Sequence, residues 1–143
     1  MTRQIAVVGG ADAGEQDMAD AKRVGTLLAQ HGAILLSGGK GGVMEASCQG
    51  AFEAGGVVVG IVPGSEGNSY CTVLIKTRMD HARNVILAGS ADAVIAIGGE
   101  YGTLSEIALA LKLHIAVYGI RTWNIPGVIR CDSPEEAVFL AMS

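Results

Sequence analysis

The segment Gly98–Glu106, with the sequence GGEYGTLSE, brings glycines, a threonine hydroxyl and a carboxylate close together in the chain. It follows Ala93–Ile97, a short apolar run without polar alternation, which is typical of a strand buried on both faces of a parallel sheet. A helix that leaves such a strand directs its free backbone N–H groups, and the positive end of its dipole, beyond the edge of the sheet. The segment therefore predicts a site for an anion such as a phosphate group.

Thr103 and Glu106 have two interpretations. The order Thr-x-x-Glu is that of a capping box, in which both side chains only satisfy backbone N–H groups at the start of a helix. In the alternative, the hydroxyl of Thr103 binds the phosphate and the carboxylate of Glu106 faces the rest of the ligand. The spacing of the two residues leaves both interpretations open.

Two further glycine-rich turns, Gly9–Gly10 and Ser37–Gly42, also lie between a predicted strand and a predicted helix. Because the carboxyl ends of parallel strands meet at one edge of a sheet, we expect all three turns to line one crevice for a phosphorylated ligand. The competing interpretation is that tight connections simply need the positive φ of glycine. Neither GxGxxG nor the Walker A spacing GxxxxGK[ST] is present, which disfavours a nicotinamide dinucleotide and a P-loop.

Strand and helix signals alternate along the whole chain, without a linker or an internal repeat. They predict one α/β domain, residues 1–143, with a mainly parallel sheet. The expected strands are residues 5–8, 33–36, 57–62, 72–75, 93–97, 115–118 and 128–130. Helices are expected at residues 15–30, from about 43 to 55, from 80 to 88, after the turn at 98–102, and from Ser133, whose sequence Ser-Pro-Glu-Glu is that of a capped helix start.

The composition limits the function classes. The chain has 143 residues, a net charge of -4 and 50% hydrophobic but only 4% aromatic residues. The negative charge argues against binding to bulk nucleic acid or to an anionic membrane, although Lys76, Arg78 and Arg83 could together hold one phosphate. No apolar stretch approaches the roughly 20 residues that span a bilayer, and the expected location is cytoplasmic.

Cysteine and histidine residues are few and scattered. Their spacing matches neither a disulfide framework nor a CxxC or HxxxH metal site. The interpretation is that the thiols are reduced and that no structural metal is bound. The residues concerned are Cys48, Cys71, Cys131, His31, His81 and His114.

Three elements together resemble a known family. The segments Ser37–Met44 (SGGKGGVM), Arg83–Asn84 and Gly99–Glu106 resemble, in order and spacing, the LOG-like or SLOG group of Rossmann-like proteins. The resemblance extends from about residue 4 to residue 118. It implies a three-layer Rossmann-like domain that forms homodimers or larger homo-oligomers. In characterised members of the group, the activity is cleavage of the N-glycosidic bond of nucleoside 5'-monophosphates to a free base and ribose 5-phosphate.

The family motif PGGxGTxxE implies roles for individual residues. Gly99, Gly102 and Thr103 would hold the phosphate, Glu106 would act at the ribose, and Arg83 stands where the family has an arginine before the motif. These roles agree with the chemistry, because a carboxylate stabilises the positive charge that develops on the sugar and an arginine neutralises phosphate or polarises the leaving base.

The chain departs from the family pattern at three places. Gly98 replaces the proline of PGG, Asn84 replaces a basic residue, and Met79–Arg83 reads MDHAR where the family has Met-His-x-Arg. These departures resemble the subgroup that includes molybdenum cofactor carrier proteins, which bind a phosphorylated pterin without a required reaction. Both a phosphoribohydrolase and a carrier or sensor are therefore expected functions, and neither requires a cofactor for its own chemistry.

The label "lysine decarboxylase" that this group has often carried is rejected for this chain. A pyridoxal-phosphate enzyme needs a Schiff-base lysine in a cofactor pocket and is much larger. The candidate catalytic residues are Arg83 and Glu106. The candidate ligand-binding residues are Gly9, Gly10, Ser37, Gly38, Gly39, Asn84, Gly98, Gly99, Gly102 and Thr103.

Overall fold

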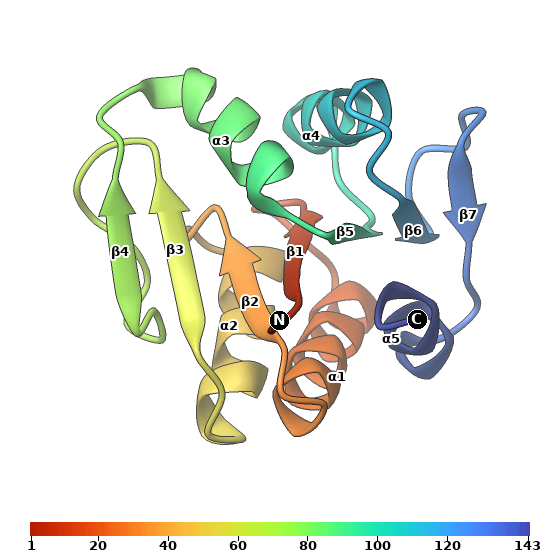
Figure 1. Ribbon diagram of the computed structural model, residues 1–143, viewed down its shortest axis with the longest axis horizontal. Coiled ribbons are helices and arrows are strands. Elements are labelled where there is room, and N and C mark those ends of the chain that lie inside the picture. The colour runs from red at the N-terminus through yellow and green to blue at the C-terminus, as the bar shows by residue number, and fades with distance from the viewer.

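The computed structural model describes all residues, Met1–Ser143, as one α/β domain built on a seven-stranded sheet (Figure 1). The strand order is β4-β3-β2-β1-β5-β6-β7, and every neighbouring pair is parallel. The elements are β1 (Gln4–Gly9), α1 (Glu15–Gln30), β2 (Ile34–Ser37), α2 (Val43–Glu53), β3 (Val58–Val62), β4 (Val73–Lys76), the 3-10 helix η1 (Asp80–Ala82), α3 (Arg83–Ser90), β5 (Ala93–Ile97), α4 (Tyr101–Lys112), β6 (Val117–Ile120), β7 (Val128–Arg130) and α5 (Pro134–Ala141).

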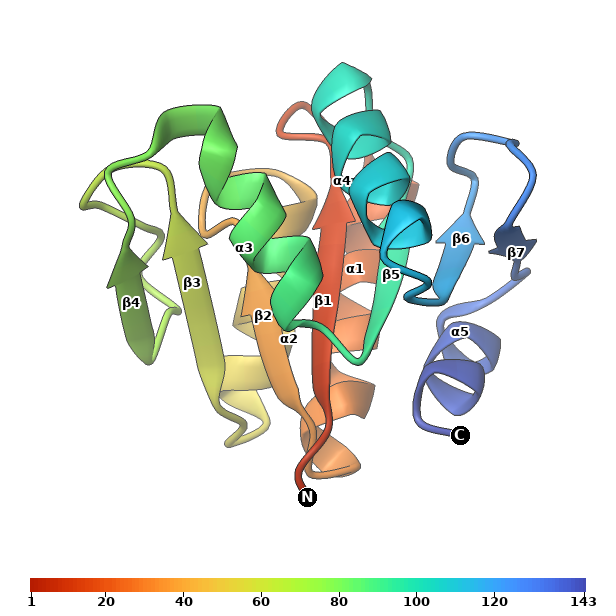
Figure 2. The ribbon, with the colours of Figure 1, turned by 45° about the horizontal axis from the view of Figure 1, so that its top comes forward.

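Helices cover both faces of the sheet. Figure 2 shows α3 and α4 in front of the strands and α1 and α2 behind them, while Figure 1 places α5 on the same side as α1. Two buried clusters of mostly aliphatic side chains fill the two interfaces. The central strands β1 and β5 are almost wholly buried, which explains why their sequences are continuous apolar runs. The expected three-layer architecture with a mainly parallel sheet is confirmed, and the sheet is parallel throughout.

The direction of chain progress reverses between β1 and β5. From β1 the chain adds β2, β3 and β4 on one side, and it then returns to place β5, β6 and β7 on the other side. The helices that follow β1 and β5, α1 and α4, therefore leave toward opposite faces of the sheet (Figure 2). Such a switch point opens a crevice beyond the carboxyl ends of the two strands, where ligands of α/β proteins commonly bind.

Most predicted elements agree with the structure, and two differ. The strand expected at residues 115–118 is β6 at Val117–Ile120, because α4 ends late: His114 has a φ of 60° and the N–H of Ile115 donates to Ala110 O. The helix expected from 80 to 88 is a 3-10 turn followed by α3. No helix is long and apolar enough to cross a membrane.

The predicted cap of the last helix is present in a modified form. The hydroxyl of Ser133 accepts a hydrogen bond from the N–H of Glu136 at 3.1 Å, as a capping box requires. The carboxylate of Glu136 accepts from the N–H of Asp132 at 2.8 Å and not from that of Ser133. The carboxylate of Glu136 therefore binds the N–H of the residue before the N-cap, where a standard capping box uses the N–H of the N-cap itself.

Candidate functional site

A cavity of about 480 Å³ lies at the switch point between β1 and β5. Its walls come from the loop after β1, from η1 and the start of α3, and from the turn after β5 with the start of α4. The lining residues are Gly9, Gly10, Ala11, Asp12, Ala13, Gly14, Asp17, Met44, His81, Arg83, Asn84, Gly99, Glu100, Gly102, Thr103 and Glu106. The cavity thus joins residues that are up to 97 positions apart, from Gly9 to Glu106.

The two glycine turns at the cavity approach each other closely. A Cβ atom on Gly10 would lie 3.5 Å from the Cα of Gly99. Gly99 has a φ of 97°, in the region that favours glycine, and a Cβ there would collide with the side chain of Thr103. The N–H of Val43 donates to Gly10 O at 3.0 Å and ties the first turn to α2. Close packing and the positive φ therefore explain the glycine at Gly99, whereas a Cβ at Gly10 would make only an ordinary van der Waals contact.

The start of α4 rules out the capping interpretation of Thr103 and Glu106. The helix begins at Tyr101, Glu100 precedes it, and no side chain caps it. Thr103 and Glu106 are therefore within the helix and do not form a capping box. Both are buried, with exposed fractions of 3% and 8%, and both line the cavity. The first turn of α4 consequently presents uncapped backbone N–H groups and the Thr103 hydroxyl beside this cavity.

Arg83 and Glu106 form a buried ion pair. Arg83 Nη1 lies 3.7 Å from Glu106 Oε2, and the two side chains are 12% and 10% exposed. Burial raises the pKa of Glu106 to about 7, and the nearby charge of Arg83 offsets only part of this effect. Burial also lowers the pKa of Arg83, although the carboxylate of Glu106 opposes that shift. Loss of hydration outweighs the attraction between the charges, so near pH 7 Glu106 exists in both its neutral and its charged form.

Two polar atoms at the cavity wall have no hydrogen-bond partner. They are Arg83 Nη1, a donor, and Asn84 Oδ1, an acceptor, and both are buried. A buried polar atom without a partner costs about 1–3 kcal/mol, and such atoms are rare in folded proteins. A donor and an acceptor on adjacent residues of one cavity would both be satisfied by a polar ligand.

The structure brings eight of the twelve predicted residues to the cavity: Gly9, Gly10, Arg83, Asn84, Gly99, Gly102, Thr103 and Glu106. It places Ser37, Gly38, Gly39 and Gly98 elsewhere. The hydroxyl of Ser37 is buried and accepts from the N–H of Gly39 at 3.0 Å. Gly39 lines a separate, smaller cavity. Gly98 O accepts from the hydroxyl of Thr122 at 2.6 Å.

Gly38 has a supporting position. A Cβ atom at Gly38 would lie 2.9 Å from Cζ of Arg83, so the glycine leaves the space that the guanidinium occupies. The second glycine turn thus packs behind Arg83 and positions it. Lys76 and Arg78, which the sequence grouped with Arg83, do not line the cavity.

Sequence reasoning missed Asp12, Asp17, Met44, His81 and Glu100, which also line the cavity. Asp12 and Asp17 follow the first glycine turn closely, and that proximity was a usable signal. Asp17 is paired with Arg121, with Arg121 Nη2 at 2.8 Å from Asp17 Oδ1. No cluster of three or more His, Cys, Asp or Glu side chains is arranged to hold a metal ion.

Comparisons with known proteins agree with this architecture. A family model described as the SLOG cluster4 family matches residues 2–141. An uncharacterised protein of Archaeoglobus fulgidus is 46% identical over 143 residues, covering 98% of this chain and 95% of the relative. A cytokinin riboside 5'-monophosphate phosphoribohydrolase of Arabidopsis thaliana is 36% identical over 80 residues, covering 52% of this chain but only 35% of the enzyme.

Two similar solved structures cover nearly the whole chain. The molybdenum cofactor binding protein of Rippkaea orientalis has a TM-score of 0.93 and 35% identity, covering 99% of this chain and 96% of that one. The molybdenum cofactor carrier protein of Chlamydomonas reinhardtii has a TM-score of 0.90 and 31% identity, covering 99% and 97%. Similarity over nearly the whole chain is thus found both to an uncharacterised protein and to molybdenum cofactor proteins, whereas the similarity to the enzyme is partial.

Proposed function

This chain belongs to the SLOG cluster4 family, and on that premise we propose that its cavity binds a small phosphorylated ligand of the nucleotide or pterin class. The observation that carries the proposal is the pair of buried atoms without a hydrogen bond, Arg83 Nη1 and Asn84 Oδ1, beside the uncapped start of α4. A ligand with a phosphate and a polar ring or sugar supplies hydrogen-bond partners for both buried atoms and for the free N–H groups at the start of α4. The cavity of about 480 Å³ is within the usual range for small-molecule sites.

The phosphate would bind at the start of α4. Backbone N–H groups from the turn at Gly99 and from the first turn of the helix donate to its oxygens, and the helix dipole adds to the attraction. The hydroxyl of Thr103 donates one more hydrogen bond. Hydrogen bonds to a charged phosphate are roughly twice as strong as those between neutral groups, so this end of the ligand supplies most of the affinity.

The rest of the ligand would face the buried polar residues. Arg83 Nη1 donates to a carbonyl, hydroxyl or phosphate oxygen, and Asn84 Oδ1 accepts from an N–H or O–H group. Glu106 acts as an acceptor in its charged form and also as a donor in its neutral form. This set suits a heterocycle or a sugar, because both offer donors and acceptors together.

We favour binding without turnover, with the molybdenum cofactor in the ligand class as cargo. The support is that solved structures similar over 99% of this chain bind or carry that cofactor. A phosphorylated pterin also fits the donor set, since its phosphate matches the start of α4 and its ring offers both donors and acceptors to Arg83 and Asn84. The chain would hold the cargo and shield it from water.

The second candidate is hydrolysis of a nucleoside 5'-monophosphate, which the buried Arg83–Glu106 pair favours. In that reaction the bond between C1' and the base nitrogen breaks, and its electron pair goes to the base. Water adds to C1' and one proton ends on the base, which gives free base and ribose 5-phosphate. The charged form of Glu106 would stabilise the positive sugar, and Arg83 would polarise the leaving base or bind phosphate.

Calorimetric titration with inorganic phosphate, ribose 5-phosphate and AMP tests the binding proposal. We expect ribose 5-phosphate to bind more tightly than phosphate, and Gly99→Ala to weaken both at least tenfold because its Cβ collides with the side chain of Thr103 and displaces the hydroxyl. Gly89→Ala is the matched control, since a Cβ there lies no closer than 3.7 Å to any neighbour. No binding of either probe to the unmodified protein at millimolar concentration would overturn the proposal.

Chromatography of the same AMP mixtures separates the two candidates. Release of free base that Glu106→Gln abolishes, with phosphate affinity kept within a few fold, establishes the enzyme. Binding without any release of base establishes the carrier.

A further inference from the structure

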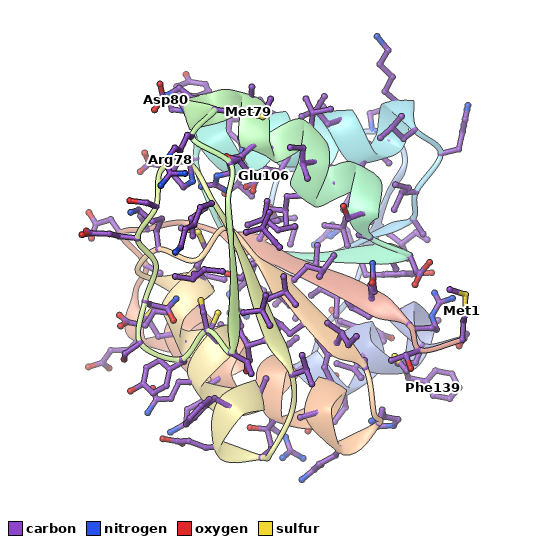
Figure 3. The ribbon with its side chains drawn as sticks, turned by 60° about the vertical axis from the view of Figure 1, so that its left-hand side comes forward. Met1, Arg78, Met79, Asp80, Glu106 and Phe139 are labelled. Carbon is purple, nitrogen blue, oxygen red and sulfur yellow. The ribbon has the colours of Figure 1, made fainter.

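A second cavity, of about 360 Å³, adjoins the first. It is lined by Pro63, Asp80, His81 and Arg83, and it shares His81 and Arg83 with the main cavity. Figure 3 shows Arg78, Met79 and Asp80 gathered at the same end of the molecule as Glu106. We call this space the Asp80 cavity. The two cavities therefore meet at His81 and Arg83.

The Asp80 cavity differs chemically from the main one. Its walls are a proline ring, an imidazole, a guanidinium and a carboxylate, and no glycine turn contributes. Flat surfaces beside an acceptor suit a planar heterocycle better than a phosphate. The carboxylate of Asp80 also makes no ion pair or hydrogen bond within the protein, so it is free to accept from a ligand.

The backbone holds Asp80 in a costly conformation. Arg78 and Asp80 both have positive φ, 53° and 50°, on either side of Met79. The segment is fixed by hydrogen bonds, since the hydroxyl of Thr77 donates to Val62 O at 2.7 Å and the N–H of Asp80 donates to Pro63 O at 3.1 Å. Strained residues held by their surroundings are concentrated at ligand sites. Here the strain sets a carboxylate at the rim of a cavity.

We propose that the Asp80 cavity receives the ring of the ligand and that Asp80 selects a ring with a 2-amino-4-oxopyrimidine edge, as found in guanine and in pterins. This inference rests on the proposed function. Such an edge carries an N–H and an adjacent NH₂, which donate to the two oxygens of a carboxylate, and a neighbouring carbonyl, which accepts from a guanidinium. Asp80 and Arg83 are the carboxylate and the guanidinium that line this cavity.

Adenine does not match this donor set. Its corresponding edge offers one NH₂ group beside a ring nitrogen that is an acceptor. That nitrogen carries no proton and cannot donate to the carboxylate. Hypoxanthine keeps the ring N–H but lacks the NH₂. A ligand that leaves a polar group of the site unpaired binds much more weakly. The expected order of affinity is therefore guanine or pterin first, hypoxanthine second and adenine last.

Calorimetry with GMP, IMP, AMP, ribose 5-phosphate and neopterin monophosphate tests the inference. We expect GMP or neopterin monophosphate to bind at least tenfold more tightly than AMP, with IMP between them. Asp80→Asn is expected to bring GMP, IMP and AMP within about threefold of one another while ribose 5-phosphate is unaffected. Asparagine tolerates a positive φ, so this variant keeps the backbone. Asp132→Asn, outside both cavities, is the control and is expected to keep the preference.

The outcomes separate this inference from the proposed function. Equal affinities for GMP and AMP, with ribose 5-phosphate bound, overturn the inference and leave phosphate binding intact. A preference that survives in Asp80→Asn also overturns it. Absence of ribose 5-phosphate binding overturns the proposed function itself. A stronger preference for GMP or for neopterin monophosphate supports the inference in either case and identifies a nucleotide or a pterin as the source of the edge.

Discussion

At the scale of single residues, the site is governed by the cost of burying charge. Arg83 and Glu106 are 3.7 Å apart, yet the pKa of Glu106 is raised to about 7. Loss of hydration destabilises the charged carboxylate more than the nearby guanidinium stabilises it. A carboxyl group that is half protonated near pH 7 exchanges protons and hydrogen-bond roles easily. Burial thus raises the pKa of Glu106. The second glycine turn contributes only at Gly38, which leaves space for the guanidinium of Arg83.

This tuning predicts how stability depends on pH. Between about pH 4.5, its usual pKa, and pH 7, Glu106 keeps a proton in the folded protein that it has lost in the unfolded chain. The folded state binds more protons there, so this residue makes the free energy of unfolding fall as pH rises, by at most roughly 3 kcal/mol. In Glu106→Gln that decline is expected to disappear, as measured by urea denaturation from pH 4.5 to 7.5.

Glu66→Gln, at an exposed position, is the control and is expected to keep the pH dependence of the unmodified protein. Identical pH dependence in Glu106→Gln and in the unmodified protein would contradict the assigned pKa.

At the scale of elements, the ends of the helices show where the sequence is and is not optimised. α1 is followed by Gly32 with a φ of 75° and α2 by Gly55 with a φ of 80°, the usual left-handed end of a helix. α4 ends in the same way, but the left-handed residue is His114, with a φ of 60°. A residue with a Cβ pays about 1 kcal/mol in this region.

His114→Gly is therefore expected to stabilise the protein by about 0.5–1 kcal/mol, since it removes the strain at an exposed position. Gly32→Ala, the reverse change at the end of α1, is expected to destabilise it by a similar amount. Urea denaturation of both variants measures the difference. A loss of stability in His114→Gly would show that the imidazole makes contacts worth more than the strain.

At the scale of the whole molecule, the packing of α1 on α2 secures one face of the sheet. The two helices cross where Gly25 meets Ser47 and where Gly50 meets Lys22, and a Cβ on either glycine would collide with a backbone carbonyl oxygen. This close approach packs α1 tightly against α2 on one face of the sheet. Neither glycine lines the cavity.

Gly50→Ala is accordingly expected to destabilise the protein by roughly 1–3 kcal/mol, because the helices must move apart to accept the methyl group. Gly89→Ala, an exposed glycine in α3 with space for a Cβ, is expected to leave stability unchanged or raise it by up to about 1 kcal/mol. Thermal unfolding of both variants provides the test. Equal melting temperatures would contradict the tight crossing.

The sequence by itself determined most of the elements and predicted where a ligand site would lie. Apolar runs such as Ala93–Ile97 and the glycine turns depend on interactions between near neighbours, which is why α1 and β5 were predicted at their observed positions. The motif at residues 98–106 and its resemblance to a family indicated a phosphate site with Arg83 and Glu106.

Only the tertiary structure decided how these pieces combine. That α4 starts at Tyr101 removed the capping interpretation of Thr103 and Glu106. The switch of strand order brought residues 9–14, 81–84 and 99–106 around one cavity and placed Ser37 and Gly39 outside it. It also brought Pro63, which directly follows β3, to the cavity that Asp80, His81 and Arg83 line. Such proximities depend on which strands pair and on which face each helix packs, and both are settled by contacts between residues far apart in the chain.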